Sequence, residues 1–226
     1  MIEIAARVFV FDLDDTLYLE KDFARSAFRS LSRDFGERVG GARFAEECGA
    51  LLDWGNRGNI FNLALAKCGV VTTPGLIDEL VAAYRAHTPE IAVCADAARF
   101  LSRMDGRMTG LITDGPRVTQ SAKIGALGLS DTIDQIVVTG EWGKEFSKPH
   151  SRAFEYIESR TSFRGCDLVY IADNAAKDFI APRLMGWQTV QILRPGRVHP
   201  GTANMPGYEA QHRISSFDEM AVAPIV

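Results

Sequence analysis

Val8-Phe9-Val10-Phe11-Asp12-Leu13-Asp14-Asp15-Thr16-Leu17 is the most informative run in this chain. Its four leading apolar residues are typical of a strand that is buried on both faces of a parallel sheet. Three carboxylates follow directly, and ligands of open α/β sheets gather where strands end. Because clustered carboxylates repel one another without a cation, Asp12, Asp14 and Asp15 indicate an all-oxygen metal site, with Mg²⁺ expected first. A solvated acidic turn is the alternative interpretation.

Composition restricts the class of protein. The chain has 226 residues, of which 46% are hydrophobic and 24% charged, as in a soluble globular protein with one domain and a sizeable insert. The net charge of −4 without a basic run argues against nucleic acid as a partner. No apolar run is long enough to span a bilayer, and residues 1–10 lack the features of a signal peptide. The four scattered cysteines predict free thiols in a reducing compartment, hence the cytoplasm: Cys48, Cys68, Cys94 and Cys166.

A helical insert follows the first strand. Apolar residues at helical spacing predict helices within four segments and no strand among them: 22–35, 42–54, 59–67 and 74–87. The sequence therefore predicts an all-helical domain at about 18–92, inserted into a core formed by 1–17 and 93–226.

Strands and helices alternate after the insert. Apolar runs predict strands at 107–113, 135–138, 167–172 and 187–193. Helices are expected between and beside them, at 95–104, 117–127, 151–159 and 175–185. This alternation predicts an α/β fold, a Rossmann-like parallel sheet flanked by helices. Towards the end, 195–211 is expected to be a surface loop, 213–214 an edge strand, and Ser216 the cap of a short helix.

Polar residues also follow the later strands. Thr113-Asp114-Gly115 offers a hydroxyl and backbone amides that enter a helix, an arrangement that binds phosphate, although an ordinary capped turn has the same sequence. Lys148-Pro149 follows the third strand, where a surface lysine is the alternative, and Lys144 lies nearby without a proline. Asp173-Asn174 follows the fourth strand, and Asp178 lies in the next helical turn.

These strand ends, in this order, resemble the signatures of the haloacid dehalogenase superfamily, whose commonest members are Mg²⁺-dependent phosphatases. The first signature is Asp12-Leu13-Asp14-Asp15-Thr16, and the resemblance covers about 7–17 and 95–193. Ala172 replaces the usual glycine before Asp173, and the stretch 140–147 is longer than in many members. The resemblance implies that the insert is a cap over the active site.

The resemblance also implies catalytic roles. Asp12 would attack phosphorus and form an aspartyl-phosphate, while Lys148 offsets the negative charge. Mg²⁺ would be held by Asp12, Asp173 and the carbonyl of Asp14. Asp14 would protonate the leaving alcohol and then take a proton from water, so it is expected to be protonated at the start, which a crowded acidic site favours. An acid at this position argues for phosphoryl transfer from an alcohol rather than dehalogenation.

Other residues would bind and orient. The Thr113 hydroxyl and the backbone amides of Leu13, Asp14 and Asp114 would hold the phosphoryl oxygens. Asp178 would orient Lys148 or Asn174, or serve only as a carboxylate at a helix start.

Substrate specificity should lie in the cap, because the core contacts only the phosphate. The candidates are polar or aromatic residues of the insert: Tyr18, Glu20, Asn56, Arg57, Asn59 and Asn62. Several amide side chains suit a sugar or polyol phosphate, and the chain resembles sugar-phosphate and acylneuraminate-phosphate phosphatases. A phosphosugar mutase, a 5′-nucleotidase and an inactive metal-binding scaffold are the alternatives. The expected partner is a small phosphorylated metabolite, and the protein is expected to be a monomer or a homodimer.

Overall fold

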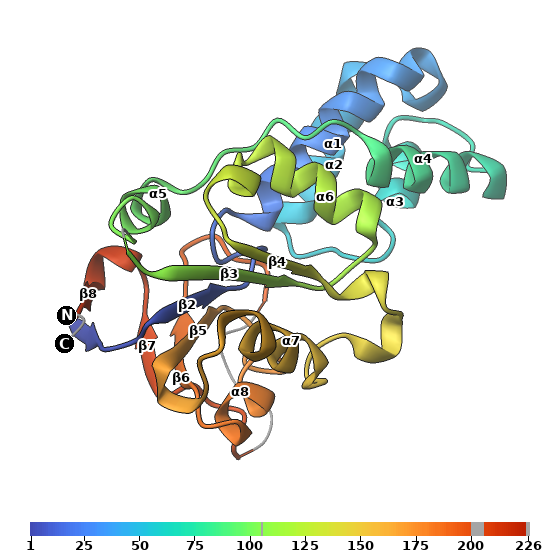
Figure 1. Ribbon diagram of the computed structural model, residues 1–226. Coiled ribbons are helices and arrows are strands. Elements are labelled where there is room, and N and C mark those ends of the chain that lie inside the picture. The colour runs from blue at the N-terminus through green and yellow to red at the C-terminus, as the bar shows by residue number, and fades with distance from the viewer. Residues whose placement is uncertain (105, 200–205, 225–226) are drawn as a thin grey trace. The chain divides into compact units, whose positions relative to one another are not determined.

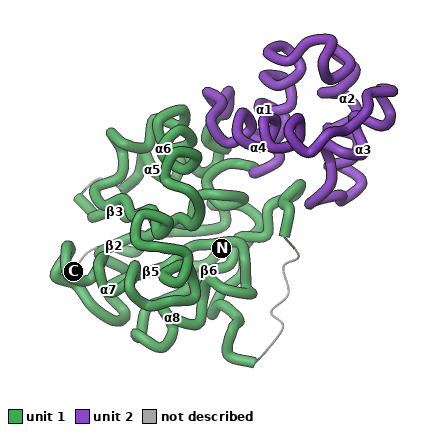
Figure 2. Tube along the Cα trace, turned by 90° about the vertical axis from the view of Figure 1, so that its right-hand side faces the viewer, with its two compact units in different colours: residues 1–19, 92–226 green, residues 20–91 purple. Residues whose placement is uncertain are grey.

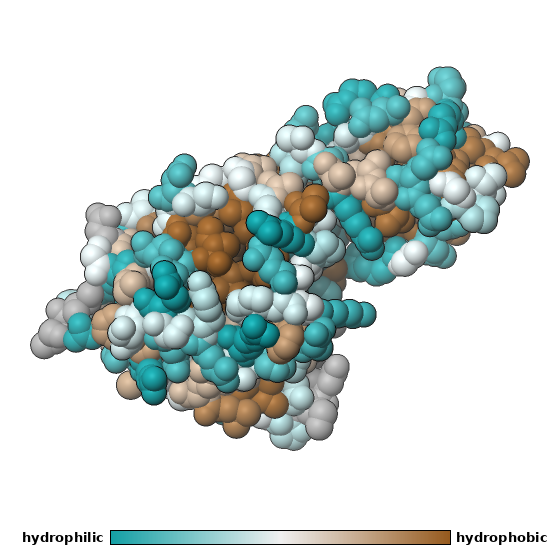
Figure 3. All heavy atoms as spheres, turned by 45° about the vertical axis from the view of Figure 1, so that its right-hand side comes forward, coloured by the Kyte–Doolittle hydropathy of each residue, from teal (hydrophilic) through white to brown (hydrophobic). Residues whose placement is uncertain are grey.

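The computed structural model describes residues 1–104, 106–199 and 206–224. The chain forms two compact units, one of residues 1–19 with 92–226 and one of residues 20–91 (Figure 2). None of the helices in the described part of the chain is long and apolar enough to cross a membrane. The face drawn in Figure 3 is mostly hydrophilic, with separate apolar patches.

The first unit is built on a six-stranded sheet in the order β4-β3-β2-β5-β6-β7, and all its strand pairs are parallel. Its strands are β2 (Val8–Phe11), β3 (Met108–Thr113), β4 (Gln135–Val138), β5 (Leu168–Ala172), β6 (Gln188–Ile192) and β7 (His212–Ile214). The predicted α/β class and the predicted strands are thus confirmed to within about a residue at their ends.

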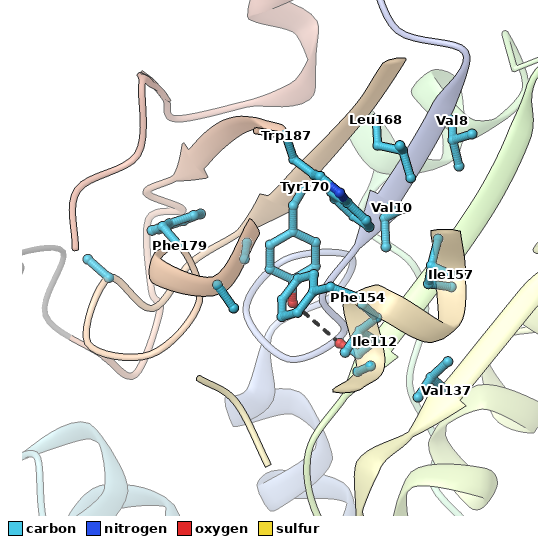
Figure 4. Packing of buried hydrophobic residues seen from close by; sticks show 14 residues of the cluster. Val8, Val10, Ile112, Val137, Phe154, Ile157, Leu168, Tyr170, Phe179 and Trp187 are labelled. Atoms are coloured by element: carbon cyan, nitrogen blue, oxygen red, sulfur yellow. Dashed lines mark hydrogen bonds between the residues drawn. The ribbon is translucent and has the colours of Figure 1, made fainter. Parts of the chain in front are cut away.

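Helices cover both faces of this sheet (Figure 1). They are α5 (Ala95–Leu101), α6 (Arg117–Ala126), α7 (Arg152–Thr161) and α8 (Ile180–Leu184). Alternate residues of β2 point to opposite faces. Val8 and Val10 pack with residues of α7 and α8 in one apolar cluster (Figure 4), while Phe9 and Phe11 contact the ring of Phe100 on the α5 side.

The register of the sheet sets the position of the polar strand ends. Phe11, the last residue of β2, pairs with Leu111 of β3 and Ile171 of β5. Because all three strands run in the same direction, the residues that follow them emerge at one edge of the sheet. Asp12 is fixed there by a backbone hydrogen bond, in which its N–H donates to the carbonyl of Ile171 over 2.9 Å.

Two segments differ from the sequence prediction. The helix expected at 175–185 begins only at Ile180, because 175–179 form turns in which the N–H groups of Lys177 and Asp178 both donate to the carbonyl of Asn174. A second, two-stranded sheet pairs β1 (Ile2–Ile4) with β8 (Met220–Val222). Strands of three residues are too short to give a recognisable alternation in sequence.

The end of the chain follows the prediction where it is described. β7 is the expected edge strand, and Ser216 caps the short 3₁₀ helix Phe217–Glu219 through a capping box. Residues 195–199 and 206–211 form neither helix nor strand, as expected for a loop, and the rest of the predicted loop lies outside the described residues.

The second unit contains helices and no strand across residues 20–91, all of which are described. Its α-helices are α1 (Glu20–Phe35), α2 (Ala42–Asp53), α3 (Ile60–Lys67) and α4 (Pro74–Ala86), which confirms the four predicted helices. Thr73 caps α4 by accepting from the N–H of Leu76, and Pro74 occupies the first helical position. The unit has an apolar core of its own, which includes Phe28, Phe44 and Leu80.

Candidate active site

Lys148 lies at the centre of the polar groups that the sheet edge brings together. Its side chain is fully buried, and its Nζ is 2.5 Å from Asp12 Oδ1 and 2.8 Å from Asp178 Oδ1. It also donates to the hydroxyl of Tyr170 over 2.9 Å. Burial alone would lower the pKa of Lys148, but the charges of Asp12 and Asp178 hold it well above its usual value. The lysine is therefore a buried cation that offsets part of the negative charge of two carboxylates.

Asp178 makes both of the contacts that the sequence offered as alternatives. It pairs with Lys148, and its Oδ2 accepts from the N–H of Asn174 over 3.0 Å. It is completely buried. Asp178 thus connects the lysine to the turn that carries Asp173.

Asp12 and Asp173 are buried carboxylates whose pKa values are raised. Burial raises the pKa of Asp12 to about 6, even though Lys148 lowers it. Burial, together with the charges of Asp12 and Asp178, raises the pKa of Asp173 to about 9. Asp173 Oδ2 is buried without a hydrogen-bond partner. A buried, unpaired carboxylate oxygen beside a second carboxylate is costly, and a divalent cation would remove that cost.

The predicted donor set for Mg²⁺ is the carboxylates of Asp12 and Asp173 and the main-chain carbonyl of Asp14, and it stays a prediction. Among the described residues, no group of three or more histidine, cysteine, aspartate or glutamate residues is arranged to hold a metal. The Asp14 side chain is engaged elsewhere, so it is not a candidate ligand.

Asp14 contacts helix α6. Lys123 Nζ lies 2.6 Å from its Oδ1, Gln120 Nε2 donates to its Oδ2 over 3.1 Å, and the Tyr18 hydroxyl donates to Oδ1. Burial would raise the pKa of Asp14, but the charge and hydrogen bond of Lys123, with the other two donors, lower it below its usual value. The lowered pKa favours the ionised form of Asp14 in the free protein, because its nearest charge is the Lys123 cation. Protonation of Asp14 at the start of the reaction stays a prediction.

Thr113 and Asp114 line the same edge. Thr113 is buried, and its hydroxyl oxygen accepts from the Gln120 amide. The Asp114 carboxylate accepts from the Thr139 hydroxyl over 2.8 Å and pairs with Lys177 over 2.7 Å. Although burial opposes it, the charges of Lys148 and Lys177 lower the pKa of Asp114. The phosphate-binding roles of Thr113 and of the amides of Leu13, Asp14 and Asp114 stay predictions.

Four residues of the site were not identified from the sequence: Gln120, Lys123, Tyr170 and Lys177. Gln120 and Lys123 are three residues apart and so share a face of α6, which begins after the Thr113 strand end. That spacing, in the helix after Thr113, was the feature of the sequence that could have identified these two residues. Lys144, the rival of Lys148 in the sequence, is exposed in a 3₁₀ turn at Lys144–Phe146.

The candidate specificity residues divide between the two units. Tyr18 belongs to the first unit and contacts Asp14. The others belong to the second unit: Glu20, Asn56, Arg57, Asn59 and Asn62. Their role in binding substrate, and the role of the second unit as a cap, stay predictions.

The chain is similar to known enzymes over most of its length. The model of a family described as "haloacid dehalogenase-like hydrolase" matches residues 6–186. A glyceraldehyde 3-phosphate phosphatase from Methanocaldococcus jannaschii is 30% identical over 196 residues, covering 82% of this chain and 84% of that protein. A ribulose-1,5-bisphosphate 5-phosphatase from Halopiger xanaduensis is 27% identical, covering 95% of this chain and 98% of that protein.

A solved structure shares the fold. YfnB from Bacillus subtilis, whose crystal structure holds magnesium, matches with a TM-score of 0.64 at 19% identity, covering 95% of this chain and 96% of that one. At this level of identity the match shows the architecture alone.

Proposed function

Because the chain belongs to the haloacid dehalogenase-like hydrolases and is an enzyme of their phosphatase type, we propose that it hydrolyses small sugar or polyol phosphates with Mg²⁺, through an aspartyl-phosphate on Asp12. One observation carries the proposal, namely the buried Lys148–Asp12 pair beside the unpartnered oxygen of Asp173. A nucleophilic carboxylate, a fixed cation and an oxygen donor for a metal are the groups that this chemistry requires.

Mg²⁺ would be held by the carboxylates of Asp12 and Asp173 and by the carbonyl of Asp14. When bound, it would neutralise charge on the phosphoryl oxygens. The raised pKa values of Asp12 and Asp173 and the unpartnered oxygen of Asp173 support this assignment.

Lys148 prepares the nucleophile. It pairs with Asp12 Oδ1, so the second oxygen of Asp12 is the one left to attack phosphorus. Thr16 lies 3.4 Å from that second oxygen, at a distance that allows a weak hydrogen bond only. Lys148 itself is fixed by Asp178 and Tyr170, and a cation held in this way costs no reorganisation during the reaction.

Asp14 would serve the leaving group. In the first step the Asp12–phosphorus bond forms, the bond to the substrate oxygen breaks, and Asp14 gives a proton to that oxygen. In the second step Asp14 takes a proton from the water that cleaves the aspartyl-phosphate. Because its pKa is lowered in the free protein, we infer that Asp14 gains its proton when the anionic substrate binds.

The substrate class follows from the relatives and from the second unit. Two relatives are named for the phosphorylated sugars glyceraldehyde 3-phosphate and ribulose 1,5-bisphosphate. We infer a substrate of similar size, recognised by amide and charged side chains of the second unit such as Asn56 and Arg57. The enzyme would act in the cytoplasm as a monomer or a homodimer.

Release of phosphate from a panel of compounds tests the proposal. The panel contains triose, pentose and polyol phosphates and nucleotides, each with Mg²⁺ and with chelator. Turnover should need Mg²⁺, favour the sugar phosphates, and fall at least about 10³-fold in Asp12→Asn. Preference for nucleotides would instead identify a nucleotidase, and ³¹P NMR would reveal a mutase by transfer to a second hydroxyl. No turnover by a folded protein that binds Mg²⁺ would leave the scaffold interpretation.

A further inference from the structure

We propose that Lys123 is a positioning residue for Asp14, and that it determines how well the enzyme expels alcohols of high pKa. The inference rests on the proposed function and extends it to a helix that contributes no predicted catalytic group. It concerns the geometry of the leaving-group side of the site.

Both oxygens of the Asp14 carboxylate are held. Oδ1 receives Lys123 Nζ at 2.6 Å and the Tyr18 hydroxyl, and Oδ2 receives the Gln120 amide at 3.1 Å. Since donors approach both oxygens, rotation of the carboxylate would break at least one hydrogen bond. The side chain is thus restricted to one orientation.

The burial of Lys123 indicates that its contact with Asp14 is specific. Only 5% of Lys123 is exposed, and lysine is almost never buried unless it is paired. Its ammonium also lies 6.0 Å from the centre of the Tyr18 ring, over the same residue that donates to Asp14. A solvent-facing lysine would serve α6 equally well, so stability of the helix does not explain its position.

Gln120 connects this group to the phosphate side of the site. Its amide donates to both Asp14 and Thr113, so one side chain sets their separation. Gln120 and Lys123 come from the same face of α6, and a rigid helix positions such side chains more accurately than a loop does. α6 therefore places the proton donor relative to the predicted phosphate ligand.

The chemical consequence depends on the leaving group. An alkoxide needs a proton as its bond to phosphorus breaks, and that proton must come from a group within hydrogen-bond reach. The p-nitrophenolate anion leaves without one. A misplaced Asp14 should therefore slow alkyl phosphates and spare p-nitrophenyl phosphate. The ratio kcat/KM isolates this step, because it includes no event after the alcohol or phenol has departed.

The test compares Lys123→Met with Arg117→Met, which removes an exposed cation from the same helix. With the best alkyl substrate of the panel, kcat/KM should fall about 30-fold or more in Lys123→Met, and with p-nitrophenyl phosphate less than about threefold. Arg117→Met should change neither. Equal losses on both substrates, or no loss, would overturn the inference.

A second variant guards against misfolding. Lys123→Gln keeps a hydrogen-bond donor without the charge, and it should show the same selectivity for alkyl phosphates with a smaller loss, about fivefold. Equal losses in this variant would also overturn the inference. If the wild-type enzyme hydrolyses neither substrate, or if Asp12→Asn retains its activity, the proposed function fails and the inference fails with it. Wild-type turnover with equal losses in the Lys123 variants removes only the inference.

Discussion

Asp12 and Asp14 are separated by one residue, yet they lie in opposite electrostatic environments. Asp12 is 6% exposed at the centre of the sheet edge, and burial raises its pKa to about 6 despite Lys148. Asp14 is partly exposed and faces α6. Although burial would raise its pKa, Lys123 and two neutral donors lower it. Asp12 shares its cation, Lys148, with Asp178. The Asp14 carboxylate, in contrast, accepts two hydrogen bonds in addition to its pairing with Lys123, from Gln120 and Tyr18.

The pKa of each carboxylate is therefore set by its neighbours in space rather than by its place in the motif. Asp12, the proposed nucleophile, lies beside other carboxylates, and their charges oppose its ionisation. Asp14, the proposed proton carrier, is stabilised as an anion in the free protein. Environments that push two titratable groups apart are typical of acid–base pairs in active sites.

The largest effect should come from breaking the Asp12 side of this comparison with Lys148→Met. Removing the ammonium leaves Asp12 and Asp178 buried without their cation, so kcat/KM should fall about 10³-fold. The free energy of unfolding should fall by about 3–5 kcal/mol in urea denaturation. Lys144→Met, at the exposed lysine nearby, should stay within about 0.5 kcal/mol of the wild type. A stable, active Lys148→Met protein would show that the pair is not essential.

The Asp14 side should respond more weakly. Asp14→Asn keeps the shape and removes the proton carrier, so kcat for alkyl phosphates should fall about 10²-fold, as is usual for the loss of a general acid. Because Asp14→Asn also takes an anionic partner from the buried Lys123, the free energy of unfolding should fall by about 1–3 kcal/mol in thermal unfolding. A loss as large as that of Asp12→Asn would mean that Asp14 does more than move protons.

Asp173→Asn should reverse the usual sign of a mutation in a buried site. The pKa of Asp173 is raised to about 9, so its ionisation destabilises the folded protein increasingly as the pH rises from about 4 toward 9. In chelator at pH 8, Asp173→Asn should therefore be more stable than the wild type by on the order of 1 kcal/mol. Added Mg²⁺ should stabilise the wild type and not the variant. A destabilised variant in chelator would contradict the interpretation of Asp173 as a carboxylate that lacks its cation.

The smallest effect should come from Asp96→Asn, at an ion pair that contacts the loop after Asp12 and Asp14. Arg194 donates to the carbonyl of Thr16 over 2.6 Å and pairs with the buried Asp96 over 2.9 Å. Burial would raise the pKa of Asp96, but the hydrogen bond and charge of Arg194 lower it.

A group with a depressed pKa adds stability above its ordinary pKa of about 4, and that stability is lost as the pH falls. Asp96→Asn should therefore cost about 1 kcal/mol at pH 7, and its deficit should shrink below pH 4 in thermal unfolding. A deficit that does not change with pH would contradict this assignment. Arg194 contacts the loop that follows Asp12 and Asp14 and neither carboxylate directly. Any loss of activity in Asp96→Asn should therefore be equal on alkyl and aryl phosphates, unlike that of Lys123→Met.

The sheet and most of the polar residues at its edge can be predicted from the sequence alone. Asp12, Thr113 and Asp173 each lie at the end of a run of buried apolar residues, and parallel strands end at a common edge. Lys148 lies ten residues beyond the end of β4, and it was predicted from the resemblance of Lys148-Pro149 to a family signature. Those positions need no knowledge of packing. The sequence also determined the helical character of residues 20–91, because apolar residues recur at helical spacing there.

The neighbours of those residues depend on how distant parts of the chain pack together. Lys123 and Asp14 are 109 positions apart, and their contact depends on which face α6 turns toward the sheet edge. Tyr170 lies in the apolar cluster (Figure 4), and only the packing reveals that Lys148 donates a hydrogen bond to its hydroxyl. The lowered pKa of Asp14 in the free protein has the same origin, because Lys123 and Gln120 come from a later part of the chain. A pKa depends on charges within a few ångströms, and those neighbours come from distant parts of the chain.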